Sequence, residues 1–224
     1  MSIETDVFEG MQYAVRFPEN YKEGQRYPIL FFLHGAGTRG EDISNITTHS
    51  FLRRPDNWPD FKFIIVAPFC QKNTWFDVFE TLRRFAFFVA DQPYTDKKRI
   101  YLTGNSMGGY GTWQLAMSLP ELFAAAAPLC GGGMYWNAAR LVNVPIWAFH
   151  GALDKSVFLE ESVKMVNAVN KRGGNARLTV YPQNKHNCWT DTYSNPALYE
   201  WFLTNENQNA EALVDEYNNS KDFG

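Results

Sequence analysis

A serine flanked by glycines stands between a strand-like run and a helix-like run, and this feature constrains the fold more than any other. Residues 104–108 read Gly-Asn-Ser-Met-Gly, directly after the run 99–103 and at the start of a helical stretch, 107–118. A serine at such a sharp turn takes a strained backbone conformation, and glycine on each side lets neighbouring chain pass closely. The sequence therefore predicts a nucleophile elbow with Ser106 at its tip.

A histidine base and an orienting carboxylate should follow this serine, in the chain order Ser, Asp or Glu, His. The four histidines are His34, His49, His150 and His186, and only the last two follow Ser106. The acids between Ser106 and His186 are Glu121, Asp154, Glu160 and Glu161. Only Asp154 lies just beyond a strand-like run, 144–149. His150 precedes Asp154, so we expect it to be a packed residue at the strand end. Asp154 and His186 are the predicted acid and base.

Two backbone amides are the expected donors to a developing oxyanion. The N–H of Met107 opens the helix after the serine and is one of them. The run 27–33 leads into His-Gly-Ala-Gly at residues 34–37, whose Ala36 N–H is the second. His34 lies before the serine, so we expect it to stabilise this loop through hydrogen bonds.

Four motifs together resemble those of the α/β-hydrolase superfamily. They are Leu-His-Gly-Ala-Gly at 33–37, Gly-Asn-Ser-Met-Gly-Gly at 104–109, Phe-His-Gly-Ala-Leu-Asp at 149–154 and Lys-His-Asn-Cys-Trp at 185–189. The resemblance reaches Leu203 and is greatest to single-domain carboxylesterases, including the dienelactone hydrolase-like, phospholipase/carboxylesterase and predicted-peptidase or feruloyl-esterase-like groups. One departure is Lys185, because a glycine is common before the base in these groups. The resemblance implies a serine esterase.

Strand-like runs mostly alternate with helical segments, which predicts one α/β domain over residues 1–204 with helices on both faces of a mostly parallel sheet. The expected strands are 12–17, 27–33, 61–67, 99–103, 123–129, 144–149 and 176–181, the first one or two pairing antiparallel. The expected helices are 77–90, 107–118, 159–171 and 196–203. Hydrolases of this fold often insert a lid where this chain has only the short segment 131–143, so we expect a minimal lid or none.

The charge of the chain is concentrated in residues 205–224, an acidic and asparagine-rich tail. The formal net charge of the whole sequence is −3, and the tail contributes −4. The body of the chain, residues 1–204, therefore carries +1. Because the tail has few groups to bury, we expect a mobile segment or a frayed helix. A nearly neutral body offers no basic field for nucleic acid and no strong steering of charged substrates, which favours neutral esters.

The sequence predicts no cofactor and no metal site, because it contains no glycine-rich phosphate loop, ligand cluster or repeat. Cys70, Cys130 and Cys188 are odd in number and lack metal spacing, which favours reduced thiols. The first residues lack the basic flank and apolar core of a signal peptide, and no stretch is long enough to cross a membrane. We expect a cytoplasmic protein that binds neither nucleic acid nor membrane, with the mature form of a secreted protein as the open alternative. The oligomeric state is not predicted.

Aromatic residues gather in the loops after the strands, where this fold sets its specificity. They are Trp75, Phe76, Tyr135, Trp136 and Trp189, and we expect them to line an acyl or aryl pocket. The competing interpretation is that they are ordinary hydrophobic anchors of the loops. The main hypothesis is a carboxylic-ester hydrolase for short acyl or hydroxycinnamoyl esters. The alternatives are a peptidase or thioesterase that uses the same triad, and a ligand-binding protein on a hydrolase scaffold without turnover.

Overall fold

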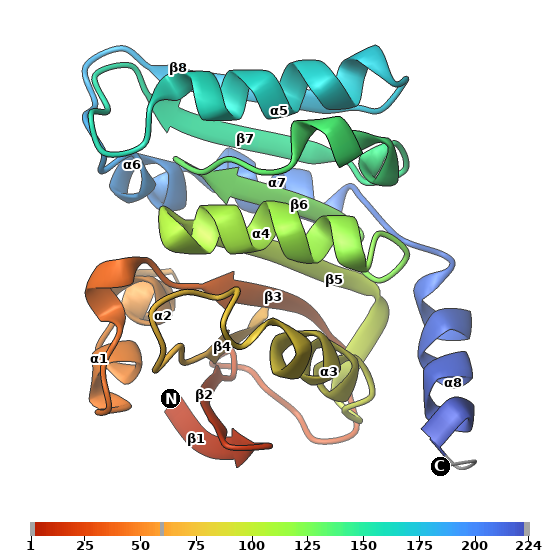
Figure 1. Cartoon of the computed structure of the whole chain (residues 1–224). Helices are drawn as coiled ribbons and strands as arrows, with labels where there is room; N and C mark the ends of the chain where they lie inside the picture. The colour runs from red at the N-terminus through yellow and green to blue at the C-terminus, as the bar shows by residue number, and fades with distance from the viewer. Residues whose placement is uncertain (1–2, 59–60, 222–224) are drawn as a thin grey trace.

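An eight-stranded sheet with the order β1-β2-β4-β3-β5-β6-β7-β8 runs through the computed structural model, which describes residues 3–58 and 61–221 (Figure 1). β1 (Ile3–Phe8) and β2 (Met11–Arg16) form an antiparallel pair, and β2 is also antiparallel to β4. The strands parallel to their neighbours in the rest of the sheet are β3 (Tyr27–Leu33), β4 (Ile64–Pro68), β5 (Thr95–Asn105), β6 (Ala125–Leu129), β7 (Ile146–Gly151) and β8 (Ala176–Tyr181). This topology confirms the predicted α/β-hydrolase fold with an antiparallel start.

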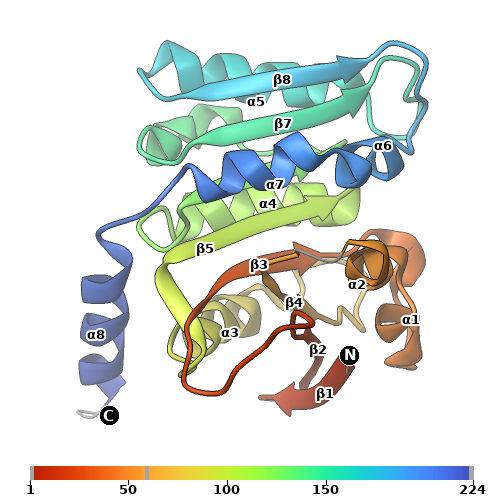
Figure 2. The same cartoon turned by 180° about the vertical axis from the view of Figure 1, so that it is seen from behind.

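Helices cover both faces of the sheet. The face seen in Figure 1 carries α3 (Phe79–Ala90), α4 (Met107–Ser118) and α5 (Leu159–Lys171), with α8 (Ala210–Lys221) beside α3. The opposite face, seen in Figure 2, carries α1 (Ser44–Thr47), α2 (Ser50–Arg53), α6 (Trp189–Ser194) and α7 (Pro196–Leu203). Among the described residues, no helix combines the length and the apolar character that crossing a membrane requires.

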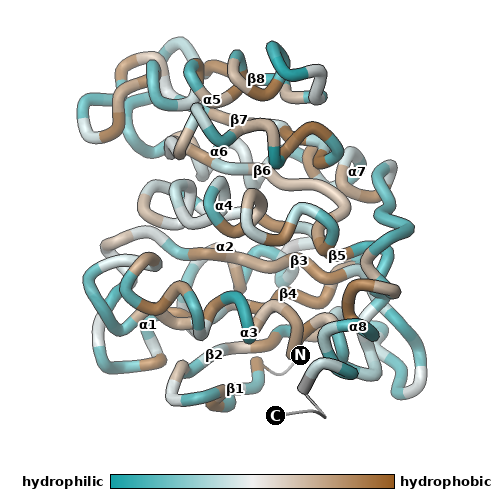
Figure 3. The backbone as a smooth tube through the Cα atoms, turned by 45° about the vertical axis from the view of Figure 1, so that its right-hand side comes forward, coloured by the Kyte–Doolittle hydropathy of each residue, from teal (hydrophilic) through white to brown (hydrophobic). Residues whose placement is uncertain are grey.

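The central strands are apolar on both sides, and each side packs into a separate core. In β3, Ile29 and Phe31 join the core beneath α3 and α4, whereas Leu30 and Phe32 join the core beneath α2 and α7. Figure 3 shows the hydrophobic colour along β3 and its neighbours. A strand buried on both faces reads as a continuous apolar run, which is why the sequence located these strands well.

Several elements differ from the expected ones. β1 was not predicted, because its residues are mostly exposed and form no apolar run. β5 begins at Thr95 rather than residue 99, since its first residues are polar. α3 begins at Phe79 rather than residue 77, because the Asp77 carboxylate accepts hydrogen bonds from Thr74 in the preceding turn. Six helices were not predicted, because they are too short to show a helical periodicity in the sequence. They are α1, α2, α6 and the 3-10 helices η1 (Ala36–Thr38), η2 (Arg54–Asn57) and η3 (Tyr135–Leu141).

The connection between β6 and β7 contains η3 and no further helix, so the minimal lid expected from the sequence is confirmed. After α7, the acidic segment forms α8. Val214 of α8 is fully buried, and Tyr217 stacks on Phe87 of α3 with ring centroids 3.8 Å apart. A short apolar stripe within this acidic helix therefore covers the edge of the main core.

The elbow glycines allow α4 to pass directly beneath the ends of two strands. A Cβ atom on Gly108 would lie 1.8 Å from the Leu33 carbonyl oxygen, and one on Gly109 would lie 2.3 Å from the Leu129 oxygen. A Cβ on Gly104 would lie 2.5 Å from the Gly108 oxygen. The predicted reason for these glycines, a close approach of helix and strand, is confirmed.

We expect Gly108→Ala to lower the free energy of unfolding by about 3 kcal/mol or more, because backbone atoms must shift to admit the methyl group. Urea unfolding monitored by circular dichroism measures this change. Gly37→Ala is the control, because no atom lies within 4 Å of its added Cβ. Equal stability of the two variants would contradict the tight contact between α4 and β3.

Candidate active site

Ser106 occupies the tip of a strained turn between β5 and α4. Its backbone has φ 56° and ψ −118°, in a region that residues other than glycine rarely adopt. The conformation is held from both sides: the Ser106 N–H donates to the Leu129 oxygen at 3.0 Å, and its carbonyl accepts from Tyr110 at 3.1 Å. The turn therefore presents the side chain beyond the carboxyl end of β5.

The structure brings the three predicted side chains into one hydrogen-bonded chain. His186 Nε2 lies 2.8 Å from Ser106 Oγ, and His186 Nδ1 lies 2.7 Å from Asp154 Oδ2. Asp154 follows β7 and His186 follows β8, so all three groups stand at the carboxyl ends of parallel strands. The arrangement allows proton transfer from the serine to an imidazole that is oriented by a carboxylate.

The loops that carry the acid and the base press against each other. A Cβ atom on Gly151 would lie 2.1 Å from the carbonyl oxygen of Lys185, and the Leu153 N–H donates to the Asn184 oxygen at 2.9 Å. Lys185, the departure from the related sequences, thus contributes its backbone to this contact. The contact fixes the distance between the Asp154 and His186 loops.

Asp154 is fully buried as a side chain and is held in its ionised form by hydrogen bonds. Burial alone would raise its pKa, but the bond to His186 and those from the N–H groups of Val157 and Ser156 outweigh burial, so the pKa lies below its ordinary value. The two amides donate to Oδ1 at 3.0 and 2.8 Å. Oδ2 is thereby left to orient the imidazole.

His150 packs beneath Asp154, as expected of a residue at the end of β7. Its Nε2 lies 2.9 Å from the Val157 oxygen and 3.3 Å from Asp154 Oδ2, and its Nδ1 lies 2.8 Å from the Ser162 hydroxyl. The contact with Asp154 was not predicted, because a spacing of four residues indicates proximity within a helix, and these two residues lie at the end of a strand and in the turn after it.

Ala36 and Met107, the predicted oxyanion donors, are each the first residue of a helix, η1 and α4. The N–H groups in the first turn of a helix lack a carbonyl partner within that helix. Gly35 packs against the elbow, since a Cβ on it would lie 3.6 Å from Ser106 Cβ. The loop after β3 thus lies against the turn that carries Ser106, and the oxyanion roles of Ala36 and Met107 stay predictions.

His34 anchors this loop, as the sequence predicts. Its Nδ1–H donates to the Gly35 oxygen at 2.8 Å and its Nε2 accepts from the Cys70 N–H at 3.0 Å. Burial lowers its pKa to about 4, so the ring is neutral at pH 7. Trp75 packs on the ring and donates from its indole to the His34 oxygen at 3.0 Å.

A cavity of about 360 Å³ adjoins the serine. Its lining residues are Gly35, Ala36, Gly37, Thr38, His49, Asn105, Ser106, Ser156, His186 and Trp189. Trp189 is the predicted aromatic residue that the structure places there, and its ring meets that of His186 at 5.4 Å. The indole forms one wall of the space beside the base.

The other four aromatic residues do not line this cavity. The expectation for Trp75 is wrong, because its side chain is fully buried against His34 as a structural anchor. Phe76, Tyr135 and Trp136 are more than half exposed, and none of them is among the described lining residues. Phe76 follows the buried Trp75, and Tyr135 and Trp136 lie in η3 after β6, so their loops direct them to solvent rather than to the serine.

Four polar lining residues were not predicted: Thr38, His49, Asn105 and Ser156. Asn105 and Ser156 adjoin predicted site residues along the chain, which was a usable signal. His49 gave none, because it lies in a polar loop and reaches the site only through the fold of α1 and α2.

Cys130, Asp154 and His186 each offer one atom that could bind a metal ion, and these atoms lie within 4.8 Å of one another. The Asp154 oxygens and the His186 nitrogens already form the hydrogen bonds described above. Burial also raises the pKa of the Cys130 thiol, which disfavours the thiolate that binds metals. Asp154 and His186 are therefore better explained as members of the hydrogen-bonded triad with Ser106 than as ligands of a metal ion.

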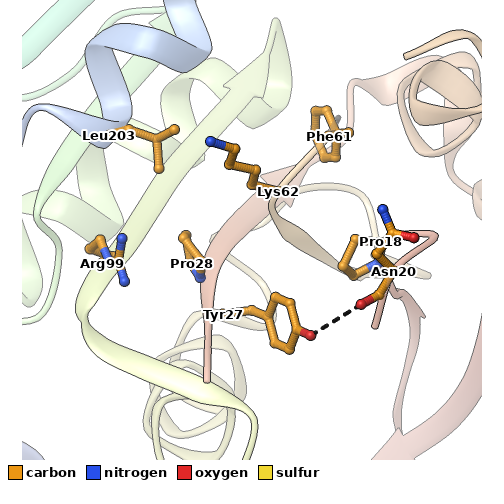
Figure 4. A pocket seen from close by; sticks show the side chains of 8 residues that line it. All are labelled: Pro18, Asn20, Tyr27, Pro28, Phe61, Lys62, Arg99 and Leu203. Atoms are coloured by element: carbon orange, nitrogen blue, oxygen red, sulfur yellow. Dashed lines mark hydrogen bonds between the residues drawn. The ribbon is translucent and has the colours of Figure 1, made fainter. Parts of the chain in front are cut away.

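A second cavity, of about 400 Å³, lies at the other end of the sheet (Figure 4). Tyr27, which begins β3, and Arg99 of β5 line it together with Pro28 and Leu203. The Tyr27 hydroxyl donates to the Asn20 oxygen at 3.4 Å. This cavity contains none of the predicted site residues.

Known proteins resemble this chain over most of its length. Residues 48–223 match the model of the family described as "Dienelactone hydrolase family". Feruloyl esterase D of Neurospora crassa is 26% identical over 155 residues, which cover 64% of this chain and 53% of the relative. A solved structure of a thermostable esterase has a TM-score of 0.73 at 29% identity and covers 92% of this chain and 63% of that chain.

Longer peptidases also match. Dipeptidyl-peptidase 5 of Aspergillus fumigatus is 22% identical over 224 residues, which cover 77% of this chain and 30% of the relative. The chain thus spans less than a third of the length of the curated dipeptidyl peptidases that it matches.

The lowered pKa of His34 predicts a pH-dependent stability. In the folded protein this pKa is about 4 against an ordinary 6.5, so as pH falls the unfolded chain binds the proton first. Stability is therefore complete above pH 6.5 and is lost toward pH 4, at about 1.4 kcal/mol per pH unit from this residue. Urea unfolding of the wild type and His34→Gln at pH 7.5 and pH 5 measures the difference, which we expect to shrink at pH 5. A constant difference would show that His34 is not held neutral.

Proposed function

Because this chain belongs to the dienelactone hydrolase family and is a hydrolase of the dienelactone hydrolase and esterase type, we propose that it hydrolyses carboxylic esters through an acyl-enzyme on Ser106. The hydrogen-bonded chain from Ser106 through His186 to Asp154, with distances of 2.8 and 2.7 Å, carries this proposal. A serine hydroxyl that donates to an oriented imidazole is an activated nucleophile.

In the first half of the reaction, Ser106 Oγ attacks the acyl carbon while His186 Nε2 takes the hydroxyl proton. Asp154 stabilises the imidazolium that forms, and the N–H groups of Ala36 and Met107 donate to the oxyanion. His186 then gives the proton to the departing alcohol. Water enters, loses a proton to His186 and attacks the acyl carbon. The bond between the acyl carbon and Ser106 Oγ then breaks, His186 returns its proton to Oγ, and the acid is released.

The cavity supports a small substrate. Its volume of about 360 Å³ lies near the lower end of the range for small-molecule sites. Trp189 supplies one flat apolar wall, which suits a short acyl or an aryl group, and the short β6–β7 connection leaves the site without a large lid. Small neutral esters, lactones among them, are the proposed substrates.

We expect Ser106→Ala and His186→Ala to lower kcat by about 10⁴-fold or more, and Asp154→Asn by about 10⁴-fold, because the three groups act as a unit. The measurement is kcat/KM on p-nitrophenyl esters, methyl hydroxycinnamates, a lactone, an acyl thioester and aminoacyl p-nitroanilides. Preferred turnover of the thioester or the anilides would favour the thioesterase or the peptidase alternative over the esterase.

Covalent labelling by a fluorophosphonate separates an enzyme from a ligand-binding protein on the same scaffold. We expect labelling at Ser106 in the wild type and in Ser44→Ala, an exposed serine outside the cavity, but not in Ser106→Ala. A wild type that neither reacts with the probe nor turns over any ester would contradict the proposed function.

A further inference from the structure

His150, at the end of β7, is fully buried, and both of its ring nitrogens lie at hydrogen-bonding distance from oxygen atoms. Nδ1 lies 2.8 Å from the Ser162 hydroxyl of α5, and Nε2 lies 2.9 Å from the Val157 carbonyl oxygen. Nε2 also lies 3.3 Å from Asp154 Oδ2. The kind of oxygen at each of these three positions determines how many hydrogens the ring carries.

The Ser162 hydroxyl can only accept a hydrogen bond from His150. A hydroxyl has one hydrogen, and Ser162 Oγ donates it to the carbonyl oxygen of Gly131 at 2.9 Å, because a carbonyl oxygen has no hydrogen to offer. Without a hydrogen on Nδ1, two lone pairs would face each other at 2.8 Å in a fully buried place, which is costly. Nδ1 of His150 therefore carries a hydrogen.

The second ring nitrogen faces acceptors as well. The Val157 carbonyl oxygen can only accept. Burial raises the pKa of Asp154, but hydrogen bonds outweigh burial and hold this pKa below its ordinary value, so the carboxylate is ionised and also only accepts. Nε2 of His150 must then carry a hydrogen too. A ring with hydrogens on both nitrogens is an imidazolium, with a charge of +1.

Other titratable side chains surround this pair without competing for it. Burial raises the pKa values of the Cys130 thiol after β6 and of the Tyr110 hydroxyl of α4, so both are uncharged at pH 7. Glu161 of α5 and Lys155 of the turn after β7 reach solvent, which screens their charges. Asp154 is thus the buried opposite charge for the imidazolium.

We propose that His150 is an imidazolium paired with Asp154 in the resting protein, and that its charge keeps His186 neutral, and so able to accept a proton, at a lower pH than an uncharged residue would. Asp154 Oδ2 lies 2.7 Å from His186 Nδ1 and 3.3 Å from His150 Nε2, so these nitrogens are no more than about 6 Å apart. A like charge at this range disfavours protonation of the second ring. His150 is thus a positioning residue that acts on the base across a shared oxygen. Only this effect on His186 rests on the proposed function.

Nitrogen NMR tests the charge of His150 independently of activity. In a long-range ¹H–¹⁵N correlation spectrum, a neutral ring shows one bare and one protonated nitrogen, whereas an imidazolium shows two protonated nitrogens. At pH 8 an ordinary histidine, with a pKa of about 6.5, is neutral. We expect His150 to show the imidazolium pattern at this pH and His150→Gln to lack it. His34→Gln, His49→Asn and His186→Ala each remove one other ring, so elimination assigns the pattern even if His150→Gln does not fold.

The pH profile of kcat/KM on a p-nitrophenyl ester tests the effect on His186. The rate falls at low pH as the base of the free enzyme becomes protonated. In His150→Gln a neutral amide replaces the charge, so protonation of His186 is no longer opposed, and we expect the midpoint of this fall to rise by about one pH unit. His34→Gln is the matched control, because it makes the same change at a buried but neutral histidine and should leave the midpoint in place. Thermal unfolding and fluorophosphonate labelling of Ser106 verify that both variants are folded.

The outcomes separate this inference from the proposed function. A bare nitrogen on the His150 ring at pH 8 would overturn the inference and leave ester hydrolysis untouched. An unchanged midpoint in a folded and active His150→Gln would overturn the effect on His186, because a merely structural residue lowers the rate across the profile without moving its midpoint. A wild type that hydrolyses no ester and is not labelled at Ser106 would overturn the proposed function and with it the effect on His186, and the NMR spectrum would still decide the charge of His150.

Discussion

The passage of the first turn of α4 beneath the end of β3 is the contact on which the rest of the site depends. The position of a Cβ on Gly108, 1.8 Å from the Leu33 oxygen, shows that helix and strand touch through their backbones. The loop with Ala36 continues from β3, and the turn with Ser106 leads into α4. This contact between two backbones therefore positions the loop that carries Ala36 against the turn that carries Ser106 and Met107, independently of any flexible side chain.

Burial acts differently on Asp154 and on the two histidines His34 and His49 near the serine. Desolvation lowers the pKa values of His34 and His49 to about 4, so both rings stay neutral over most of the range between pH 7 and pH 4. Asp154 resists the same effect because three hydrogen-bond donors converge on it. Its negative charge is thus matched to His186, whose Nδ1 lies 2.7 Å from Asp154 Oδ2 and whose imidazolium it would stabilise during ester cleavage.

The sequence was sufficient to predict an element or a site residue wherever backbone geometry or burial left a strong pattern in it. The strained turn at Ser106 needs glycine neighbours, and β3, β6 and β7 are buried on both faces, so both features were predictable. β1, α1 and α2 are short or exposed, and their positions depend on contacts with distant residues. The role of Trp75 could not be predicted for a similar reason. In the sequence, an aromatic residue of a loop looks the same whether it faces a ligand or, as here, anchors His34. The sequence did not predict His49 as a lining residue, because its position in the cavity depends on where α2 packs.

The hydrogen-bonded chain joins the ends of β5, β7 and β8, and 80 positions of sequence separate its serine from its histidine. β6 lies between β5 and β7, so the hydrogen bonds among Ser106, His186 and Asp154 form only when β5, β6, β7 and β8 all occupy their places in the sheet. Under the proposed mechanism, a nascent or partly unfolded polypeptide would have an ordinary, unreactive serine. A probe that labels Ser106 as proposed would therefore count native molecules alone.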